Sequence, residues 1–269
     1  MGKHQRRARA IRLAVAAVVA LGMCVPVAGV AGATSPGPRI VGGETAPITD
    51  YPYAVYLVDN AGSQFCGGVL VGPSAVATAA HCAVGAHPSD LRVVTGRQDK
   101  RTRDGVVARV SAIWIPPQFK DPTKGSDFAV LRLDRPVRYR PVDLPAQNDD
   151  SFYTAGTDAT VLGWGRTSEG GDRSDVLRRA TVPVMADSDC SADYGLYDPA
   201  GMVCAGYPRG GIDACQGDSG GPLVVGNTLI GLVSWGEGCA QPAKPGVYTR
   251  IAVYADAIRA QARSGRPVW

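Results

Sequence analysis

The sequence predicts an all-β fold, and three observations support this prediction. Short segments alternate apolar and polar residues, as expected for strands that bury one face. Turn-forming residues separate these segments, and the 269 residues include 34 Gly and 20 Pro without a repeat of fixed period. Few helical patterns intervene, so the sequence favours a β-sandwich or β-barrel over an α/β fold.

The expected elements run from residue 40 onward. The strand-like segments are residues 53–58, 68–71, 91–95, 128–133, 159–162 and 229–235. Turn signals occur at residues 60–62, 169–171, 210–211 and 226–227. Ile251, Tyr254 and Ile258 recur at helical spacing and predict one helix near the end of the chain. The Pro-rich stretch 134–148 lacks a pattern and is expected to connect two halves.

Residues 1–33 have the three parts of a secretory signal peptide: basic residues within 3–12, an uncharged stretch over 13–33, and small residues at 31–33. An uncleaved membrane anchor is the alternative, because the uncharged stretch is nearly long enough to span a bilayer. Pro and Gly in its second half favour cleavage. Arg6 and Arg7 leave open general secretory or twin-arginine export. We expect a secreted, extracellular protein without a stable membrane anchor.

The basic character of the chain is confined to this leader. Six of the 28 Lys and Arg residues lie in residues 1–39, which contain none of the 24 Asp and Glu residues. The rest of the chain therefore carries a net charge of −2. Because no basic stripe remains, we do not expect nucleic-acid binding.

Cysteine content fits an oxidising compartment. Six of the seven cysteines follow the leader: Cys66, Cys82, Cys190, Cys204, Cys215 and Cys239. An even number in an exported chain predicts three disulfides, for which about 15 pairings are open. A zinc site is not expected, because no two cysteines have C-x₂-C spacing and no histidine lies near the later four.

Only two histidines, His81 and His87, follow the leader, so histidine-dependent chemistry must use one of them. His87 precedes Pro88 in a loop and is expected to be solvated. His81 directly follows an apolar segment and precedes Cys82, which suits a rigidly held general base. A structural histidine is the alternative interpretation.

Two further candidates would complete a hydrolytic site. Glycines flank Ser219 in the segment 217–221, as an exposed hydroxyl nucleophile with nearby amide donors requires. An ordinary Gly-rich turn is the alternative. Asp127 begins the segment 127–133, whose apolar residues would anchor it, and is the candidate to orient His81.

Three segments carry a resemblance to a known family. T-A-A-H-C at 78–82, D-F-A-V-L-R-L at 127–133 and C-Q-G-D-S-G-G-P at 215–222, in this order, resemble the chymotrypsin-like serine peptidases of trypsin type, including secreted bacterial trypsins. Shorter matches occur at 40–43, 66–68, 163–165, 234–236 and 245–248. The resemblance covers residues 40–269. It implies two six-stranded antiparallel β-barrels, at about 40–145 and about 146–269, with a C-terminal helix.

The resemblance implies a serine endopeptidase with Ser219, His81 and Asp127 as its catalytic triad. The amides of Gly217 and Ser219 would form the oxyanion hole. It also implies the disulfides Cys66–Cys82, Cys190–Cys204 and Cys215–Cys239. The implied substrate-binding residues are Asp213, Ala214, Gln216, Ser234, Trp235, Gly236 and Gly246.

Asp213 lies six residues before Ser219, where trypsin-like members have the pocket acid. A buried carboxylate needs a cation, which a substrate Arg or Lys supplies. Ala214 stands where many trypsins have Ser, and lacks the hydroxyl that helps to hold a lysine. We therefore expect cleavage after Arg and Lys, with Arg preferred. The expected partners are such polypeptides and proteinaceous protease inhibitors, and the expected state is a monomer.

Activation is expected between Arg39 and Ile40, with residues 34–39 as a short propeptide. The new ammonium of Ile40 would pair with Asp218 and order the site, so the uncleaved chain should lack that contact. The sequence leaves self-activation and activation by another protease open.

No cofactor or metal is expected. The stretch 95–105 mixes cations with its acids, which opposes Ca²⁺ binding, and Asp187 and Asp189 form no complete ligand set. The alternative function is a catalytically inactive homologue that acts as a binding protein. Retention of His81, Asp127 and Ser219 argues against it. The sequence does not separate broad digestive from narrow regulatory specificity.

Overall fold

The computed structural model describes residues 40–264. The expected signal peptide (1–33) and propeptide (34–39), with Arg39, lie outside the described residues. Within the described part of the chain, no helix is both long and apolar enough to cross a membrane.

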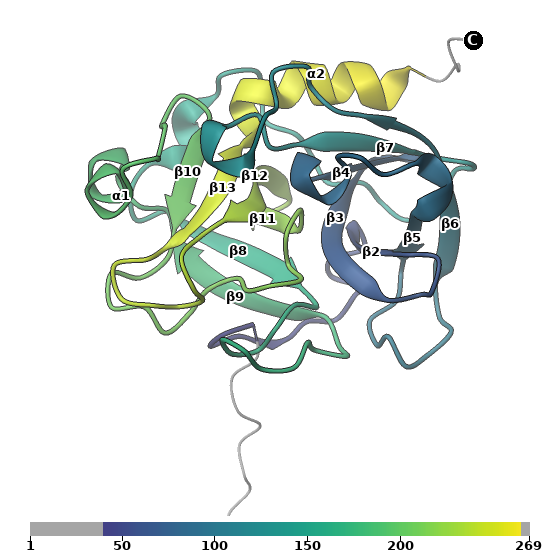
Figure 1. The fold of residues 1–269 in the computed structure, drawn as a ribbon, viewed down its shortest axis with the longest axis horizontal. Helices are drawn as coiled ribbons and strands as arrows, with labels where there is room; N and C mark the ends of the chain where they lie inside the picture. The colour runs from purple at the N-terminus through teal and green to yellow at the C-terminus, as the bar shows by residue number, and fades with distance from the viewer. Residues whose placement is uncertain (1–39, 265–269) are drawn as a thin grey trace, which may run out of the picture. The chain divides into compact units, whose positions relative to one another are not determined.

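The first half of the described chain forms a closed antiparallel barrel of six strands in the order β2-β3-β4-β7-β6-β5 (Figure 1). The six strands are β2 (Ala54–Val58), β3 (Gln64–Gly72), β4 (Ala75–Thr78), β5 (Arg92–Thr95), β6 (Val106–Trp114) and β7 (Ala129–Leu133). This barrel confirms the expectation for the N-terminal half.

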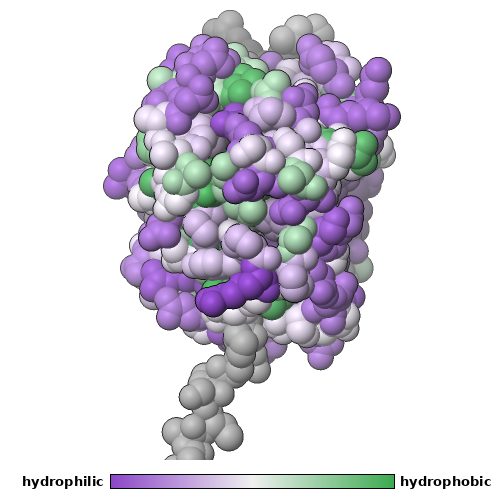
Figure 2. Space-filling model, turned by 90° about the vertical axis from the view of Figure 1, so that its left-hand side faces the viewer, coloured by the Kyte–Doolittle hydropathy of each residue, from purple (hydrophilic) through white to green (hydrophobic). Residues whose placement is uncertain are grey.

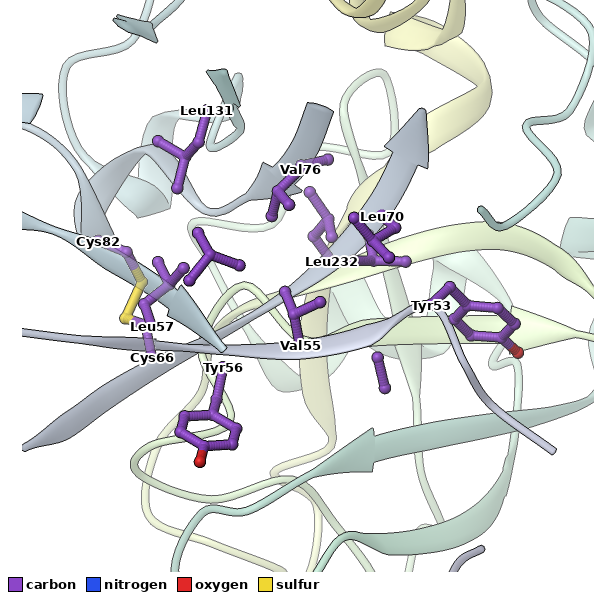
Figure 3. Packing of buried hydrophobic residues seen from close by; sticks show 14 of the residues in the cluster. Tyr53, Val55, Tyr56, Leu57, Cys66, Leu70, Val76, Cys82, Leu131 and Leu232 are labelled. Carbon is purple, nitrogen blue, oxygen red and sulfur yellow. A yellow bond between two sulfur atoms is a disulfide. The ribbon is translucent and has the colours of Figure 1, made fainter. Parts of the chain in front are cut away.

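Branched and aliphatic side chains fill the first barrel. Leu57, Val76 and Leu131 are fully buried, and Figure 3 shows Leu57 beside the Cys66–Cys82 disulfide. Val55 and Tyr56 point to opposite sides of β2 (Figure 3), as the two-residue period of a strand requires. The ring of Tyr56 instead lies 5.0 Å from that of Trp164, which belongs to the second half.

The second half forms a sheet of seven strands in the order β1-β9-β8-β11-β12-β13-β10. They are β1 (Glu44–Thr45), β8 (Asp158–Gly163), β9 (Arg178–Pro183), β10 (Met202–Ala205), β11 (Pro222–Val225), β12 (Thr228–Trp235) and β13 (Gly246–Arg250). The expected count of six is exceeded because the two-residue strand β1 adds to the edge of β9. The six segments expected as strands overlap β2, β3, β5, β7, β8 and β12.

The second sheet closes through single contacts rather than a full ladder. Val184 and Ala205 form an isolated antiparallel bridge. Beside it, the amide of Gly206 donates to the carbonyl of Pro183 (3.0 Å) and the amide of Met185 donates to that of Cys204 (2.9 Å). β9 ends at Pro183, which has no amide hydrogen to continue the ladder. The sheet therefore curls into a barrel whose seam is short.

The predicted C-terminal helix is α2 (Ile251–Arg263). Its buried residues Ile251, Ala252, Ala255 and Ile258 recur at helical spacing. Ile251 and Ile258 join the core of the first barrel, and the ring of Tyr254 lies 4.7 Å from that of Phe128.

A second helix, α1 (Asp187–Asp193), has one buried residue, Cys190, and so lacks the apolar pattern that would predict it. Single 3₁₀ turns occur at η1 (Ala80–Cys82), η2 (Pro88–Asp90), η3 (Pro122–Lys124) and η4 (Asp150–Tyr153). Figure 2, which views the molecule from the left-hand side of Figure 1, shows a mainly hydrophilic surface with small, separated hydrophobic areas.

Truncation of Ile258 to Ala should lower the free energy of unfolding by about 2–5 kcal/mol, because it opens a cavity between α2 and the first barrel. Urea unfolding followed by tryptophan fluorescence measures this change. Arg263→Ala, on the exposed end of the same helix, should change stability by less than about 0.5 kcal/mol. Equal losses in the two variants would show that α2 does not complete the core.

Candidate active site

Asp127 lies at the entrance to β7 with only 1% of its surface exposed. Gly125 and Ser126 have positive φ, so the chain turns sharply there and enters the barrel. The carboxylate accepts hydrogen bonds from the amide of His81 (Oδ1, 3.0 Å) and the hydroxyl of Ser234 (Oδ2, 2.6 Å). Its main-chain carbonyl accepts the hydroxyl of Thr249 at 2.7 Å. Donors from both halves of the chain thus surround one buried acid.

His81 lies in η1, directly after β4, and the disulfide from Cys82 to Cys66 fixes this turn to β3. Its Nδ1 lies 2.8 Å from Oδ2 of Asp127. Because an ionised carboxylate only accepts hydrogen bonds, this contact assigns the proton to Nδ1 and leaves Nε2 as a free acceptor. The side chain of His81 is 26% exposed, so Nε2 is accessible to a reacting group.

Ser219 lies in the loop between β10 and β11 and is partly exposed. Its carbonyl accepts the amide of Gly67 in β3 at 2.8 Å. Within residues 40–264, neither its hydroxyl nor the amides of Gly217 and Ser219 form a hydrogen bond. A hydroxyl and two unused amide donors therefore occupy one short loop.

The contact between the two halves is so close that it excludes side chains. A Cβ on Gly220 would lie 2.2 Å from Oγ1 of Thr78 and 2.7 Å from the amide nitrogen of Ala79. Gly220 also has a φ of +77°, which favours glycine. The Ser219 loop consequently rests on the end of β4, three residues before His81.

A cavity of about 170 Å³ adjoins Ser219. Its walls contain all seven of the expected substrate-binding residues, Asp213, Ala214, Gln216, Ser234, Trp235, Gly236 and Gly246. The disulfide Cys215–Cys239 joins two of these walls. The other disulfides are Cys66–Cys82 and Cys190–Cys204, so all three pairs are those that the resemblance implies.

The carboxylate of Asp213 is the acidic group of this cavity and is 5% exposed. Its Oδ2 accepts the amide of Ala240 at 3.1 Å, whereas its Oδ1 has no hydrogen-bond partner. Burial raises the pKa of Asp213 to about 7. A Cβ on Gly246 would lie 2.7 Å from Oδ1 and 3.1 Å from the hydroxyl of Tyr248, which is also buried without a partner. Two unsatisfied oxygens therefore lie beside Gly246.

Asp218 is fully buried, and its carboxylate accepts the amides of Gly165 (2.6 Å) and Cys215 (3.0 Å). Burial raises the pKa of Asp218 to about 6, although these two hydrogen bonds oppose the shift. Ile40 is fully buried in the core of the second half. The carbonyl of its neighbour Val41 accepts the amide of Asp213 at 3.1 Å. Among the described residues, no hydrogen bond joins Ile40 to Asp218.

Metal-ligating residue types gather at one place in the described chain, Cys66, His81 and Cys82. The two sulfurs are bonded to each other, so they are not thiolate ligands. Asp187 contacts Arg250 (2.7 Å) and Tyr197, and Asp99 contacts Arg101. Each of these two acids therefore forms an ion pair with an arginine of the chain.

Sequence reasoning assigned Ser234 to the substrate backbone and did not find its bond to Asp127. It also missed Tyr248, Gln64 and Arg173, which lie near the site through contacts across the fold. A buried polar residue inside an apolar strand, such as Tyr248 in β13, was the available signal.

Comparison with known proteins agrees with this geometry. The Trypsin family model matches residues 40–258. The chain is 53% identical to a trypsin of Saccharopolyspora erythraea, over 84% of this chain and 99% of that protein. It is 39% identical to trypsin-1 of Astacus astacus, over 83% of this chain and 100% of that protein. It is 41% identical to trypsin 5G1 of Aedes aegypti, over 82% of this chain and 84% of that protein.

The chain therefore belongs to the trypsin family, the chymotrypsin-like serine peptidases of trypsin type. It is a serine endopeptidase, a hydrolase that acts on polypeptides.

Replacement of Gly220 by Ala should lower kcat/KM about 100-fold, because the new Cβ displaces the Ser219 loop by roughly 1 Å. Hydrolysis of a chromogenic arginine amide measures the effect. Gly226→Ala is the matched control: its φ of +59° is also positive, but a Cβ there meets nothing within 4 Å. Full activity of the Gly220 variant would contradict the close contact described above.

Proposed function

We propose that this peptidase cleaves polypeptides after Arg, and less rapidly after Lys. The observation that carries the proposal is the cavity beside Ser219, because its one buried carboxylate leaves Oδ1 of Asp213 without a partner. A buried carboxylate is costly until a cation pairs with it, and a substrate guanidinium supplies two donors in the matching geometry. Gly236 and Gly246 add no side chain to the cavity wall.

The preference for Arg follows from the residue next to this acid. Ala214 lines the cavity and offers no hydroxyl to an ammonium group. A lysine reaches the carboxylate as a point charge and keeps fewer hydrogen bonds than a bidentate guanidinium.

We propose that Ser219, His81 and Asp127 are the catalytic residues. The Ser219 oxygen attacks the scissile carbonyl carbon while Nε2 of His81 takes the hydroxyl proton. Collapse of the tetrahedral adduct breaks the C–N bond, and the imidazolium returns the proton to the leaving amine. Water then attacks the ester by the same proton route and releases the acid. The 2.8 Å contact from Asp127 holds the tautomer that this sequence needs.

The amides of Gly217 and Ser219 would stabilise the negative oxygen of each tetrahedral adduct. Their lack of partners in the described chain supports this role. Ser234, Trp235 and Gly236 would pair with the substrate backbone as an added antiparallel strand. No cofactor or metal is part of the proposed reaction.

We propose that cleavage between Arg39 and Ile40 activates the enzyme. The buried carboxylate of Asp218, with its pKa raised by burial, would gain a charged partner from the new Ile40 ammonium. Residues 40–41 already pack beside Asp213. The ion pair between Ile40 and Asp218 would therefore order both the pocket and the loop 217–219, which we call the oxyanion loop.

The same proposal includes secretion after removal of residues 1–33, a propeptide of residues 34–39 and a peptidase domain of residues 40–269. It includes a monomeric state and inhibition by proteins that present an Arg or Lys to the pocket. On the face drawn in Figure 2 the apolar areas are small and separated, so that face offers no large apolar patch to a second copy.

The first test compares matched Arg and Lys chromogenic amides with protein that has a free Ile40 terminus. We expect hydrolysis of both, faster after Arg. Ser219→Ala should lower kcat about a millionfold, and the uncleaved precursor should be inactive. Correctly processed, disulfide-bonded protein that hydrolyses neither amide would favour a binding function instead. Equal rates after Arg and Lys would refute the role given to Ala214.

The second test is the pH dependence of amidinium binding to the pocket. Since the pKa of Asp213 is raised to about 7, the free pocket is neutral below that pH and must lose a proton to pair with a cation. The affinity of an aryl amidine should fall about tenfold per pH unit below 7 and level off above it. Calorimetry in buffers of different ionisation enthalpy should record the released proton.

His81→Ala serves as the control in this binding experiment, because it removes a side chain that is not part of the pocket wall. The variant should keep the pH dependence and the proton release, and Asp213→Asn should lose both. An affinity that stays constant across this range in the His81 variant would contradict the protonation of Asp213.

A further inference from the structure

A second cavity, of about 480 Å³, shares no lining residue with the cavity beside Ser219. Four cationic residues line it, Arg92, Arg97, Lys100 and Arg173, against one acid, Asp59. We call this feature the basic cavity. Val58, Val94 and Val107 add an apolar wall.

None of the four cations forms an ion pair within residues 40–264. The one acid forms no ion pair with them, and its carboxylate accepts the amides of Ala61 and Ser63 in its own turn. Within the same range the cations donate hydrogen bonds only to uncharged oxygens, such as the carbonyls of Ser89 and Asp104. Burial lowers the pKa of Lys100, which shows that this ammonium is partly removed from water. Like charges gathered without ion pairs raise the energy of the protein and favour an anionic occupant.

Hydrogen bonds connect the basic cavity to the oxyanion loop. Lys100 Nζ donates to Oε1 of Gln64 at 3.0 Å, and Nε2 of Gln64 donates to the carbonyl of Gly217 at 2.8 Å. Arg173 donates to the carbonyl of Gln64 at 2.5 Å, and its Nε would lie 2.9 Å from a Cβ on Gly217. The wall of the basic cavity therefore touches a proposed oxyanion donor.

The path of a bound substrate leads to this cavity. The acyl part of the substrate occupies the Asp213 pocket and the edge of β12, so the leaving part departs on the opposite side of Ser219. β3 adjoins Ser219, because the amide of Gly67 donates to the carbonyl of Ser219, and the same strand begins at Gln64. Gln64 is a wall of the basic cavity.

We propose that the basic cavity binds acidic side chains of the polypeptide substrate on the C-terminal side of the cleaved bond. An acidic peptide offers carboxylates to the four cations and apolar atoms to the valine wall. A purely hydrophilic polyanion offers anionic groups but no apolar atoms. The inference rests on the proposed peptidase function and adds a second determinant of substrate choice, remote from Asp213.

The test uses quenched fluorescent peptides with one Arg as the cleaved residue. Two peptides that differ at one kind of position are compared. One carries Glu and the other carries Gln at about two to five residues after the Arg, because an extended chain advances about 3.3 Å per residue. We expect the Glu peptide to be cleaved with about tenfold higher kcat/KM at low salt. The ratio should fall below about twofold at 1 M salt, where the Debye length is about 3 Å.

Arg92→Gln combined with Arg97→Gln should abolish the preference while leaving hydrolysis of the Gln peptide unchanged, because neither residue contacts Gly217 or Gln64. The control removes two exposed cations elsewhere, Arg138→Gln with Arg263→Gln, and should keep the full ratio. A small arginine amide, which has no residues beyond the cleaved bond, should be hydrolysed equally by all forms.

The outcomes separate this inference from the proposed function. Failure to hydrolyse the arginine amide would overturn the peptidase assignment of the site. Hydrolysis of that amide with equal rates on the Glu and Gln peptides would overturn the basic-cavity proposal alone. Inhibition by a sulfated polysaccharide without any preference for the Glu peptide would also overturn it, in favour of a polyanion site.

Discussion

The buried carboxylate of Asp127 is the constraint on which the arrangement of the two barrels depends. An ionised acid with 1% exposure is stable only when its oxygens are fully hydrogen-bonded. His81 supplies two donors from the first half, and Ser234 supplies one from β12 in the second half. Any sliding of one barrel against the other would break a bond to this charge. The orientation of the imidazole is therefore set by the same bonds that hold the halves in register.

A steric constraint acts beside this electrostatic one. The Ser219 loop reaches the first barrel because Gly67 and Gly221 bring backbone against backbone, and because Gly220 leaves room for the hydroxyl of Thr78. Hydrogen bonds alone would tolerate small shifts, whereas this contact allows almost none. The hydroxyl of Ser219 remains unbonded in the described chain, but its place is fixed by its own backbone. The hydrogen bonds to Asp127 orient the imidazole of His81, and close backbone packing positions Ser219.

Local sequence patterns predicted much of this structure, and their failures have physical causes. Strands such as β2 and β12 were found, while β4, β10 and β13 were not, and each of these three is only four or five residues long and buried throughout. His81, Asp127 and Ser219 were found because each is marked by its immediate neighbours. Gln64 and Tyr248 were not, because their importance arises from contacts between distant segments. The number of barrels came from the family resemblance, and the seventh strand could not be foreseen because only two residues form β1.

The two ends of the described chain each attach to the opposite half. β1, at the start, pairs with β9 of the second sheet, and α2, at the end, places Ile251 and Ile258 in the core of the first barrel. The strands of the first barrel close within residues 54–133, but the core cluster of that barrel also includes residues of β12 and α2. The hydrophobic core is therefore complete only when the last helix of the chain is in place. Cooperative folding of this chain is thus an event of the whole domain, governed by contacts that are far apart in sequence and slow to form.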